Sequence, residues 1–167
     1  MGNYEFDEKN GIVKDKSTGE RCLVVGESGV KSIFKGLSRI FGAGIEVLLE
    51  ESSREASKNT VPLTDNNVDV KSLFNAYAKG FAQRGMGRLE ISELKLKEGN
   101  VTVRVWNNFF AGIRDGENTY CSYVGGLLSG VYEKVLQASP RFKETKCIGH
   151  GDQYCEFRLA LKTSSAF

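Results

Sequence analysis

The chain has 167 residues, 40% of them hydrophobic and 26% charged, which is the composition of an ordinary soluble domain large enough to bury a core. A formal net charge of +2 is too small to argue for a nucleic-acid partner, and the first ten residues, MGNYEFDEKN, lack the apolar core of a secretory signal. No apolar stretch reaches the roughly 20 residues that a spanning helix needs, so we expect one cytoplasmic domain over residues 1–167 without a membrane span.

A hairpin and a long helix are expected in the first third of the chain. Residues 11–25 contain the runs GIVKD and RCLVV around the turn KSTGE, which predicts a short hairpin. A helix is expected to begin at Val30 or Lys31, because apolar residues then recur at three- and four-residue spacing. Gly42 and Gly44 interrupt this pattern and predict a break or a bend. The stripe expected to face the core consists of Ile33, Phe34, Leu37, Ile40, Phe41, Ile45, Leu48 and Leu49.

The segment CLVVGESGVKS, at residues 22–32, has the glycines and the Lys-Ser pair of a phosphate-binding loop. Counted from Gly26, the second glycine of that motif would fall where the chain has Lys31, and Val30 stands where the loop needs glycine. A β-branched residue resists the backbone geometry that wraps a phosphate. We therefore expect a turn and a helix start here, and no nucleotide site.

A second helix and two strands are expected in the middle of the chain. Asp65 or Asp69 can cap the helix, and RGMG at residues 84–87 ends it. The side chains that this helix is expected to bury are Leu73, Phe74, Tyr77 and Phe81. Apolar residues then alternate, which indicates a strand, and the phase slips near Ser92, which predicts a β-bulge. In the strand after the turn KEGN, valines alternate with Thr, Arg and Trp106, so the valines are expected to share one face.

A third helix is expected from about Thr119, and one of its faces carries almost no side chains. Ser122, Gly126 and Gly130 lie four residues apart, and a glycine inside a helix costs about 1 kcal/mol relative to alanine. Another backbone, a partner subunit or a ligand must therefore approach this face closely. Pro140 stops the helix, and a final hairpin of RFKETKC and CEFRLAL follows. These elements predict an α+β domain with helices packed on an antiparallel sheet.

Three cysteines in the last third of the chain are the best candidates for chemistry. Cys147 and Cys155 flank the tight turn CIGHGDQYC, and Cys121 falls in the expected first turn of the third helix, where the helix dipole favours a thiolate. Three thiolates and one carboxylate suit tetrahedral zinc, and Glu144 lies close by in the sequence. The alternatives are three unconnected buried thiols and a Cys147–Cys155 disulfide.

The identity of the fourth ligand stays open on the residues alone. In a regular strand, side chains three positions apart point to opposite faces, so Glu144 can join Cys147 only if the backbone kinks between them. His150 and Asp152 in the turn are rival ligands, and so is Cys22.

The segment ETKCIGHGDQYCEF, with Cys121 upstream in a glycine-rich helix, resembles the 4-vinyl reductase domain family of predicted hydrocarbon-binding proteins. It is also similar to the zinc-containing sensor domain of the phenol- and xylene-responsive transcription activators, in which Cys, Glu, Cys and Cys hold a structural zinc. The spacing here, 23, 3 and 8 residues, fits that pattern. The resemblance therefore implies a zinc site made of Cys121, Glu144, Cys147 and Cys155.

The wider family is similar in fold to the small acyl-binding subunits of the TRAPP vesicle-tethering complex. That resemblance implies a TRAPP-like fold over about residues 12–162, a homodimer, and a small hydrophobic ligand in a core pocket. The phenol sensors hold the phenolic hydroxyl with a His and a Trp. The only histidine here, His150, lies in the cysteine hairpin, and Trp106 lies nearer Cys121 in sequence than the sensor Trp does, so a phenol ligand is not expected.

Aromatic side chains are the candidate lining of such a pocket, and the alternative is that they simply form the core. The candidates are Phe74, Tyr77, Trp106, Phe109, Phe110, Tyr120 and Tyr123. No Ser-His-Asp set, HExxH motif or pair of catalytic carboxylates is recognisable, so no enzymatic activity is expected. The predicted function is a zinc-stabilised domain that binds or senses a small hydrophobic, aromatic or hydrocarbon molecule and acts through a partner. The alternatives are an accessory to tetrapyrrole vinyl reduction and a TRAPP-like scaffold subunit.

Overall fold

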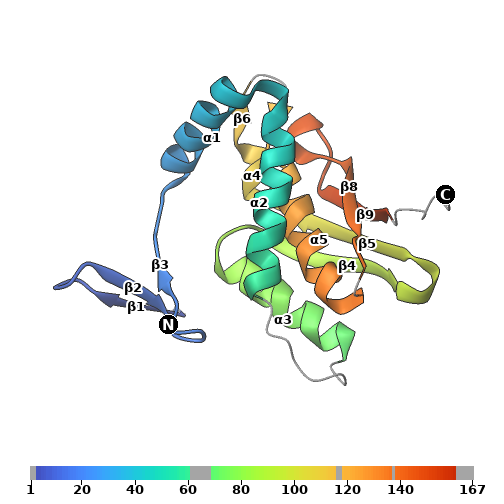
Figure 1. Ribbon diagram of the computed structural model, residues 1–167, viewed down its shortest axis with the longest axis horizontal. Coiled ribbons are helices and arrows are strands. Elements are labelled where there is room, and N and C mark those ends of the chain that lie inside the picture. Colours follow the sequence, from blue (N-terminus) through green and yellow to red (C-terminus); the bar gives the residue numbers. More distant parts are fainter. Residues whose placement is uncertain (1–2, 61–68, 116–117, 137, 161–167) are drawn as a thin grey trace. The chain divides into compact units, whose positions relative to one another are not determined.

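The computed structural model describes residues 3–60, 69–115, 118–136 and 138–160, and the chain divides into two compact units, Met1–Gly36 and Leu37–Phe167. The first unit contains a three-stranded antiparallel sheet in the order β1-β2-β3 (Figure 1). Its strands are β1 (Tyr4–Asp7), β2 (Ile12–Asp15) and β3 (Arg21–Cys22). The expected hairpin is confirmed in β2 and β3, and β1 is a strand that the sequence pattern did not predict.

The apolar segment after β3 is not a strand. Leu23 and Val24 are 85% and 70% exposed, so the hairpin prediction is wrong for residues 23–25. The reason is that β2 pairs along its length with β1 and offers β3 a register of only two residues. Helix α1 (Glu27–Phe41) begins earlier than expected, with Glu27 in its first turn, where a carboxylate stabilises the positive end of the helix dipole. The Lys-Ser pair therefore lies within a helix, as expected, and not in an open loop.

The second unit contains the remaining helices and a four-stranded sheet. The break expected at Gly42 and Gly44 is confirmed as a short 3₁₀ helix, and Gly42 takes a left-handed φ of +55°. The second expected helix is also confirmed, with Asp69 as its cap, because the Asp69 carboxylate accepts hydrogen bonds from two free backbone N–H groups of the first turn. Asp65 lies outside the described residues. The helices are η1 (Gly42–Gly44), α2 (Ile45–Thr60), α3 (Val70–Gln83), α4 (Phe109–Gly112) and α5 (Ser122–Leu136).

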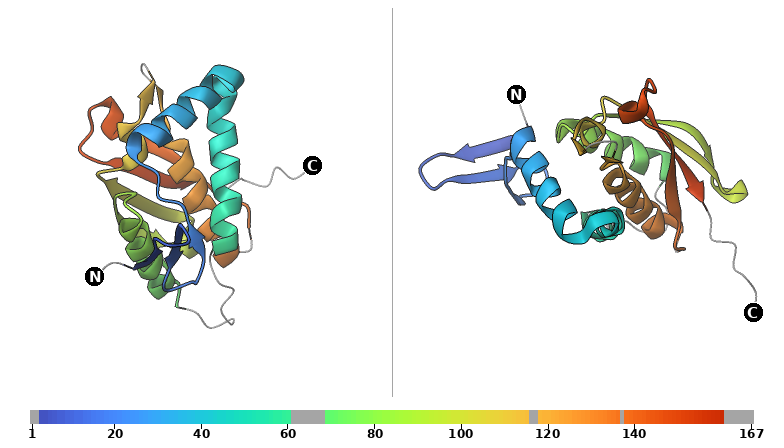
Figure 2. Two further views of the ribbon diagram at one scale, coloured as in Figure 1. Left: turned by 90° about the vertical axis from the view of Figure 1, so that its left-hand side faces the viewer. Right: turned by 90° about the horizontal axis from the view of Figure 1, so that it is seen from above.

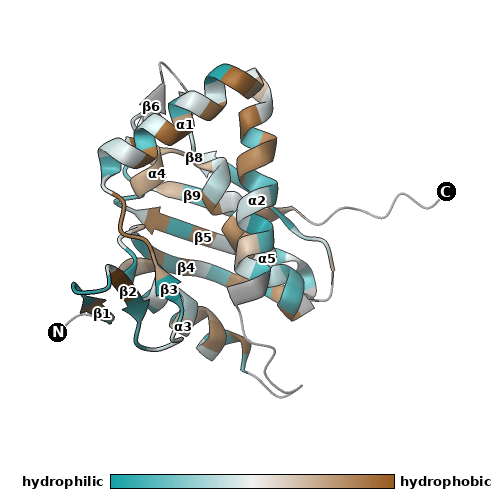
Figure 3. Ribbon diagram, turned by 60° about the vertical axis from the view of Figure 1, so that its left-hand side comes forward, coloured by the Kyte–Doolittle hydropathy of each residue, from teal (hydrophilic) through white to brown (hydrophobic). Residues whose placement is uncertain are grey.

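The predicted stripe through α1 and α2 is buried only in part. Ile45 and Leu49 on α2 are buried as expected, but Ile40 and Phe41 are 76% and 50% exposed. Because the chain turns at Gly42, a stripe drawn through both helices cannot face one core. The residues of this stripe that the structure leaves exposed are Ile33, Ile40, Phe41 and Leu48. Figure 3 shows hydrophobic residues at the corner where α1 meets α2.

The four-stranded sheet is antiparallel throughout and has the order β4-β5-β9-β8 (Figure 1). The bulge predicted near Ser92 is confirmed, because the register between β4 and β5 shifts between Ile91 and Glu93. The valines of β5 are buried, as the alternation predicted. The strands are β4 (Arg88–Lys95), β5 (Asn100–Trp106), β8 (Arg141–Lys146) and β9 (Cys155–Ala160). The shorter elements are η2 (Leu96–Glu98), β6 (Arg114–Asp115), β7 (Asn118–Thr119) and η3 (Ile148–His150).

Helix α5 lies against the sheet, and α2 packs on the side of α5 that points away from the sheet (Figures 2 and 3). A Cβ atom on Gly126 would lie 2.1 Å from the Glu50 carbonyl oxygen, and one on Gly130 would lie 2.2 Å from the Arg54 carbonyl oxygen. The small-residue face of α5 is therefore filled by the backbone of α2. This settles the three alternatives in favour of another backbone of the same chain, and the face leaves no room for a ligand.

Among the helices of the described residues, none combines the length and the apolar character needed to cross a membrane.

Candidate metal centre

The cysteines of the candidate site come from three different elements of the second unit. Cys121 precedes α5, and its carbonyl oxygen accepts hydrogen bonds from the N–H groups of Val124 and Gly125, at 2.9 and 3.1 Å. It therefore occupies the cap of the helix and not its first turn, one position earlier than expected. Cys147 directly follows β8, and Cys155 is the first residue of β9. The hairpin thus carries two of the thiols to the N-terminus of the helix that carries the third.

The donor atoms of Cys121, Glu144, Cys147 and Cys155 all lie within 4.8 Å of one another. The Cys121 sulfur is 3.7 Å from that of Cys147 and 3.9 Å from that of Cys155. Two sulfurs bound tetrahedrally to one zinc at roughly 2.3 Å would lie roughly 3.8 Å apart. All four cysteines of the chain are free, so the alternative Cys147–Cys155 disulfide is wrong. The cluster is a donor set that can hold a metal ion.

A β-bulge brings Glu144 to the same side of the hairpin as Cys147. The register between β8 and β9 shifts between Glu144 and Lys146, which leaves Thr145 as the extra residue. Thr145 turns outward, and its hydroxyl donates to the Glu156 carboxylate at 3.1 Å. The kink that Glu144 needs in order to act as a ligand is therefore present.

The rival fourth ligands lie outside the cluster. His150 is exposed on η3. The Asp152 carboxylate instead accepts a hydrogen bond of 2.8 Å from the Cys147 backbone N–H and so closes the turn. Cys22 belongs to the unit Met1–Gly36, where its sulfur lies 3.6 Å from the Glu20 carbonyl oxygen.

The electrostatics of the cluster fit a bound cation. Burial, and then the charge of Cys147, raise the pKa of Glu144 to about 7, and its Oε1 atom is buried with no hydrogen-bond partner in the described residues. Hydrogen bonds from the Cys121 and Cys155 thiols lower the pKa of Cys147. A metal ion would satisfy the orphaned carboxylate oxygen and replace the protons that the thiols otherwise share.

Two residues that the sequence pattern did not single out support the sulfur atoms. The Asn108 side-chain amide donates to the Cys121 sulfur at 3.5 Å while its oxygen caps α4. The N–H group of Ile148 donates to the Cys155 sulfur at 3.4 Å. Hydrogen bonds of this kind orient metal ligands. An asparagine at a helix start was the signal for Asn108, but it indicates a cap as readily as a second role.

The structure brings only some of the predicted pocket residues to one cavity. Tyr77 and Tyr123 line a cavity of about 150 Å³ between α2, α3 and α5, together with Phe81 and Leu127. The residues that complete its lining are Ala56, Ser57, Arg84 and Met86. Phe109 and Phe110 form an aromatic cluster that extends to Tyr123, whose ring centroid is 4.5 Å from that of Phe110.

Other predicted pocket residues lie elsewhere. Phe74 is 1% exposed and stacks on Tyr132 with a centroid distance of 4.0 Å, and Tyr120 is equally buried at the start of α5. Trp106 lies on the outer face of the sheet, where it packs on Tyr154 at 4.8 Å and donates to the Glu90 carboxylate. Strand alternation explains this placement, because the neighbouring valine of β5 points inward.

Residues 102–161 match the family model of the vinyl-4-reductase domain. This confirms the resemblance to the 4-vinyl reductase domain family that the cysteine spacing indicated. The uncharacterized protein MJ0150 of Methanocaldococcus jannaschii is 26% identical over 123 residues, which cover 72% of this chain and 68% of that protein.

The fold is shared with solved structures of sensory and trafficking proteins. The phenol-responsive sensory domain of the transcription activator PoxR, solved with phenol, superposes with a TM-score of 0.75 at 12% identity, over 94% of this chain and 84% of that one. A trafficking protein particle complex subunit 3 from Naegleria fowleri, covalently bound to palmitic acid, superposes with a TM-score of 0.53 at 15% identity, over 81% and 95%. The predicted α+β, TRAPP-like fold is confirmed.

Proposed function

We propose that this chain is a zinc-stabilised domain that binds or senses a small aromatic or hydrocarbon molecule and acts through a partner. The observation that carries the proposal is the meeting of three thiols and one buried carboxylate at donor distances, within and beside the segment that matches the vinyl-4-reductase domain. The shared fold with the PoxR sensory domain supports a sensing role.

Zinc is the metal that this donor set favours. Soft thiolate ligands select zinc over magnesium or calcium, and Cys₃-type sets are typical of structural zinc. Four protein ligands would leave no open coordination position, so the proposed metal is structural and the domain is proposed not to be an enzyme. Zinc would fasten the start of α5 to the β8–β9 hairpin, which are the elements that the four residues come from.

The aromatic cavity is the proposed ligand site. Its volume of about 150 Å³ matches that of an apolar protein cavity that binds benzene, and its lining is mostly apolar. Tyr77 and Tyr123 provide aromatic walls, and burial raises the pKa of Tyr77, which keeps its hydroxyl uncharged. The site therefore suits a neutral molecule of about one ring.

Filling this cavity is expected to abolish the binding of a one-ring probe. Ala56→Leu places three additional carbons in the cavity, so toluene should bind the native chain and bind this variant at least about tenfold more weakly. Ligand-observed NMR titration of the full chain with toluene measures both affinities. Ala76→Leu, on the exposed face of α3, is the matched control. Equal toluene affinity in the native chain and Ala56→Leu would contradict the assignment of this cavity.

Native mass spectrometry separates the proposed function from its alternatives, because it reports zinc, oligomeric mass and retained small molecules together. A retained hydrophobic molecule supports sensing. A retained tetrapyrrole supports a role in vinyl reduction, and a zinc-loaded dimer with an empty cavity supports a scaffold.

We also propose a homodimer that covers the apolar corner of the second unit. Phe41 and Val47 lie on either side of the turn between α1 and α2 and are 50% and 64% exposed. Clusters of exposed apolar side chains mark interaction surfaces. Val47→Glu is expected to shift the chain from dimer to monomer in light scattering after gel filtration, whereas Ala82→Glu, on the exposed end of α3, should leave the mass unchanged. A native chain that elutes as a monomer at high concentration would refute the dimer.

A further inference from the structure

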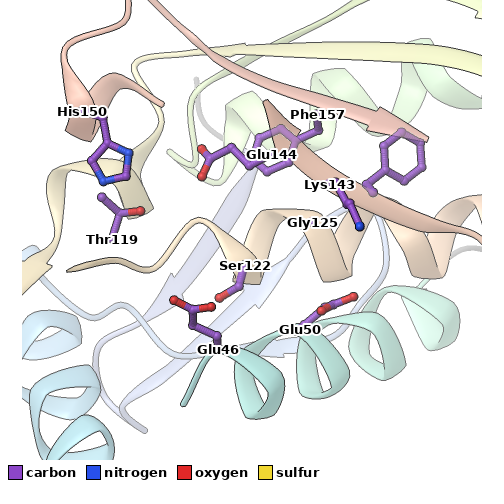
Figure 4. A pocket seen from close by; sticks show the side chains of 10 residues that line it. Glu46, Glu50, Thr119, Ser122, Gly125, Lys143, Glu144, His150 and Phe157 are labelled. Atoms are coloured by element: carbon purple, nitrogen blue, oxygen red, sulfur yellow. The ribbon is translucent and has the colours of Figure 1, made fainter. Parts of the chain in front are cut away.

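A second cavity, of about 410 Å³, opens beside the metal cluster, and its chemistry differs from that of the aromatic cavity (Figure 4). Residues of α2, α5, β8, η3 and β9 line it, all within the unit Leu37–Phe167. Most of its wall comes from residues that flank the cluster. Thr119 and Ser122 bracket Cys121, Glu144 belongs to the cluster, and His150 lies in the loop between the other two cysteines. The hairpin and the start of α5 therefore shape this cavity.

Carboxylates dominate the charge of this cavity. Glu46, Glu50 and Glu144 line it, against one lysine, Lys143. Two of these carboxylates have partners, because Glu50 accepts a 2.6 Å hydrogen bond from Arg141 and Glu144 is a proposed metal ligand. Glu46 makes no ion pair within the part of the chain that the structure describes. An uncompensated negative charge therefore stands at the wall of the cavity.

A hydroxyl without a partner points to a ligand in the same place. The Ser122 oxygen is buried and has no hydrogen-bond partner in the described residues. Figure 4 shows the Ser122 side chain directed toward Glu46, across the space that the cavity occupies. A buried polar atom left without a partner is unfavourable, so a group with hydrogen-bonding capacity fits between these two side chains.

The remaining wall is aromatic. Phe142 and Phe157 line the cavity and are 5% and 1% exposed. Aromatic rings attract cations through their negative faces, and they also provide apolar contact for a hydrocarbon group. Carboxylates beside aromatic rings are the combination that recognises amines.

We propose that this cavity binds a small organic cation, an aromatic or alkyl primary amine, with its ammonium group between Glu46 and Ser122 and its hydrocarbon part against Phe142 and Phe157. A volume of about 410 Å³ lies within the range of small-molecule sites and accommodates one ring with a short side chain. The site goes beyond the proposed function, because it is a second cavity with a ligand of opposite polarity.

Phenethylamine and 2-phenylethanol form a matched pair of probes, because they share a skeleton and differ in the charged group. Isothermal titration of the zinc-loaded full chain is expected to give at least about tenfold tighter binding for the amine. Glu46→Gln keeps the size of the side chain and should remove that preference. Glu55→Gln, on the same helix but outside the cavity, should preserve it.

Three results would overturn the proposal: no binding of the amine, equal affinities for amine and alcohol, or an amine preference that survives Glu46→Gln. Because Glu46 is exposed, its variant is expected to fold, and circular dichroism verifies this. Zinc content and toluene binding measured on the same samples report on the proposed function. Loss of amine binding with zinc and toluene binding intact would therefore refute the amine site alone.

Discussion

Chelating the metal from this chain is expected to unfold the second unit or to lower its free energy of unfolding by several kcal/mol. Structural zinc contributes on the order of 10 kcal/mol in zinc-finger peptides, and here it would join elements that are 34 residues apart, from Cys121 to Cys155. Without a cation, the cluster holds a buried carboxylate oxygen without a hydrogen-bond partner and three crowded thiols. Differential scanning calorimetry before and after dialysis against a chelator measures the change.

A cysteine substitution localises this effect to the cluster. Cys121→Ser is expected to abolish stoichiometric zinc in elemental analysis and to lower the melting temperature as chelation does. Cys22→Ser should change neither, because Cys22 lies in the unit Met1–Gly36 and outside the cluster. A chain that is purified without zinc and melts at the same temperature with and without chelator would refute the structural role of the metal.

Placing a methyl group on the bare face of α5 is expected to produce the second large effect. Gly130→Ala puts a Cβ atom 2.1 Å from the Ser57 hydroxyl oxygen and 2.2 Å from the Arg54 carbonyl oxygen. Backbone cannot rotate away as a side chain does, so α2 must shift. Ser57 would also lose the geometry of its 2.8 Å hydrogen bond to the Leu127 carbonyl. We expect a loss of roughly 1–3 kcal/mol in the free energy of unfolding, measured by urea denaturation.

The matched control is another helical glycine without crowding. Gly36 has nothing within 4 Å of its would-be Cβ atom, so Gly36→Ala should be neutral or stabilising by up to about 1 kcal/mol. If both variants gain stability equally, the close approach of α2 and α5 is refuted.

Local chemistry explains which parts of the fold were predictable. Asp69 as a helix cap, the glycine break at Gly42 and the bulge near Ser92 each follow from the preference of one or a few residues for a particular backbone geometry. The exposed stripe at Ile40 and Phe41 could not be predicted, because periodicity shows that a helix has an apolar face but not what covers it.

The candidate site was predictable in its members but not in its construction. Spacing and resemblance selected Cys121, Glu144, Cys147 and Cys155, and the structure brings these four together. The support from Asn108 depends on a contact across 13 residues that no local pattern encodes. Trp106 shows the converse, since an aromatic residue that looked suited to a pocket lies on the opposite face of its strand.

The extra residue at Thr145 has a consequence for recognising such sites in other chains. Two side chains of one strand that grip a common ion normally stand an even number of positions apart. Glu144 and Cys147 are three apart, and their shared orientation depends on one irregular backbone step. An odd interval between two ligands in a β-ribbon is thus a written trace of that step. Deleting Thr145 would make the interval even, and an unkinked strand could then present the same pair.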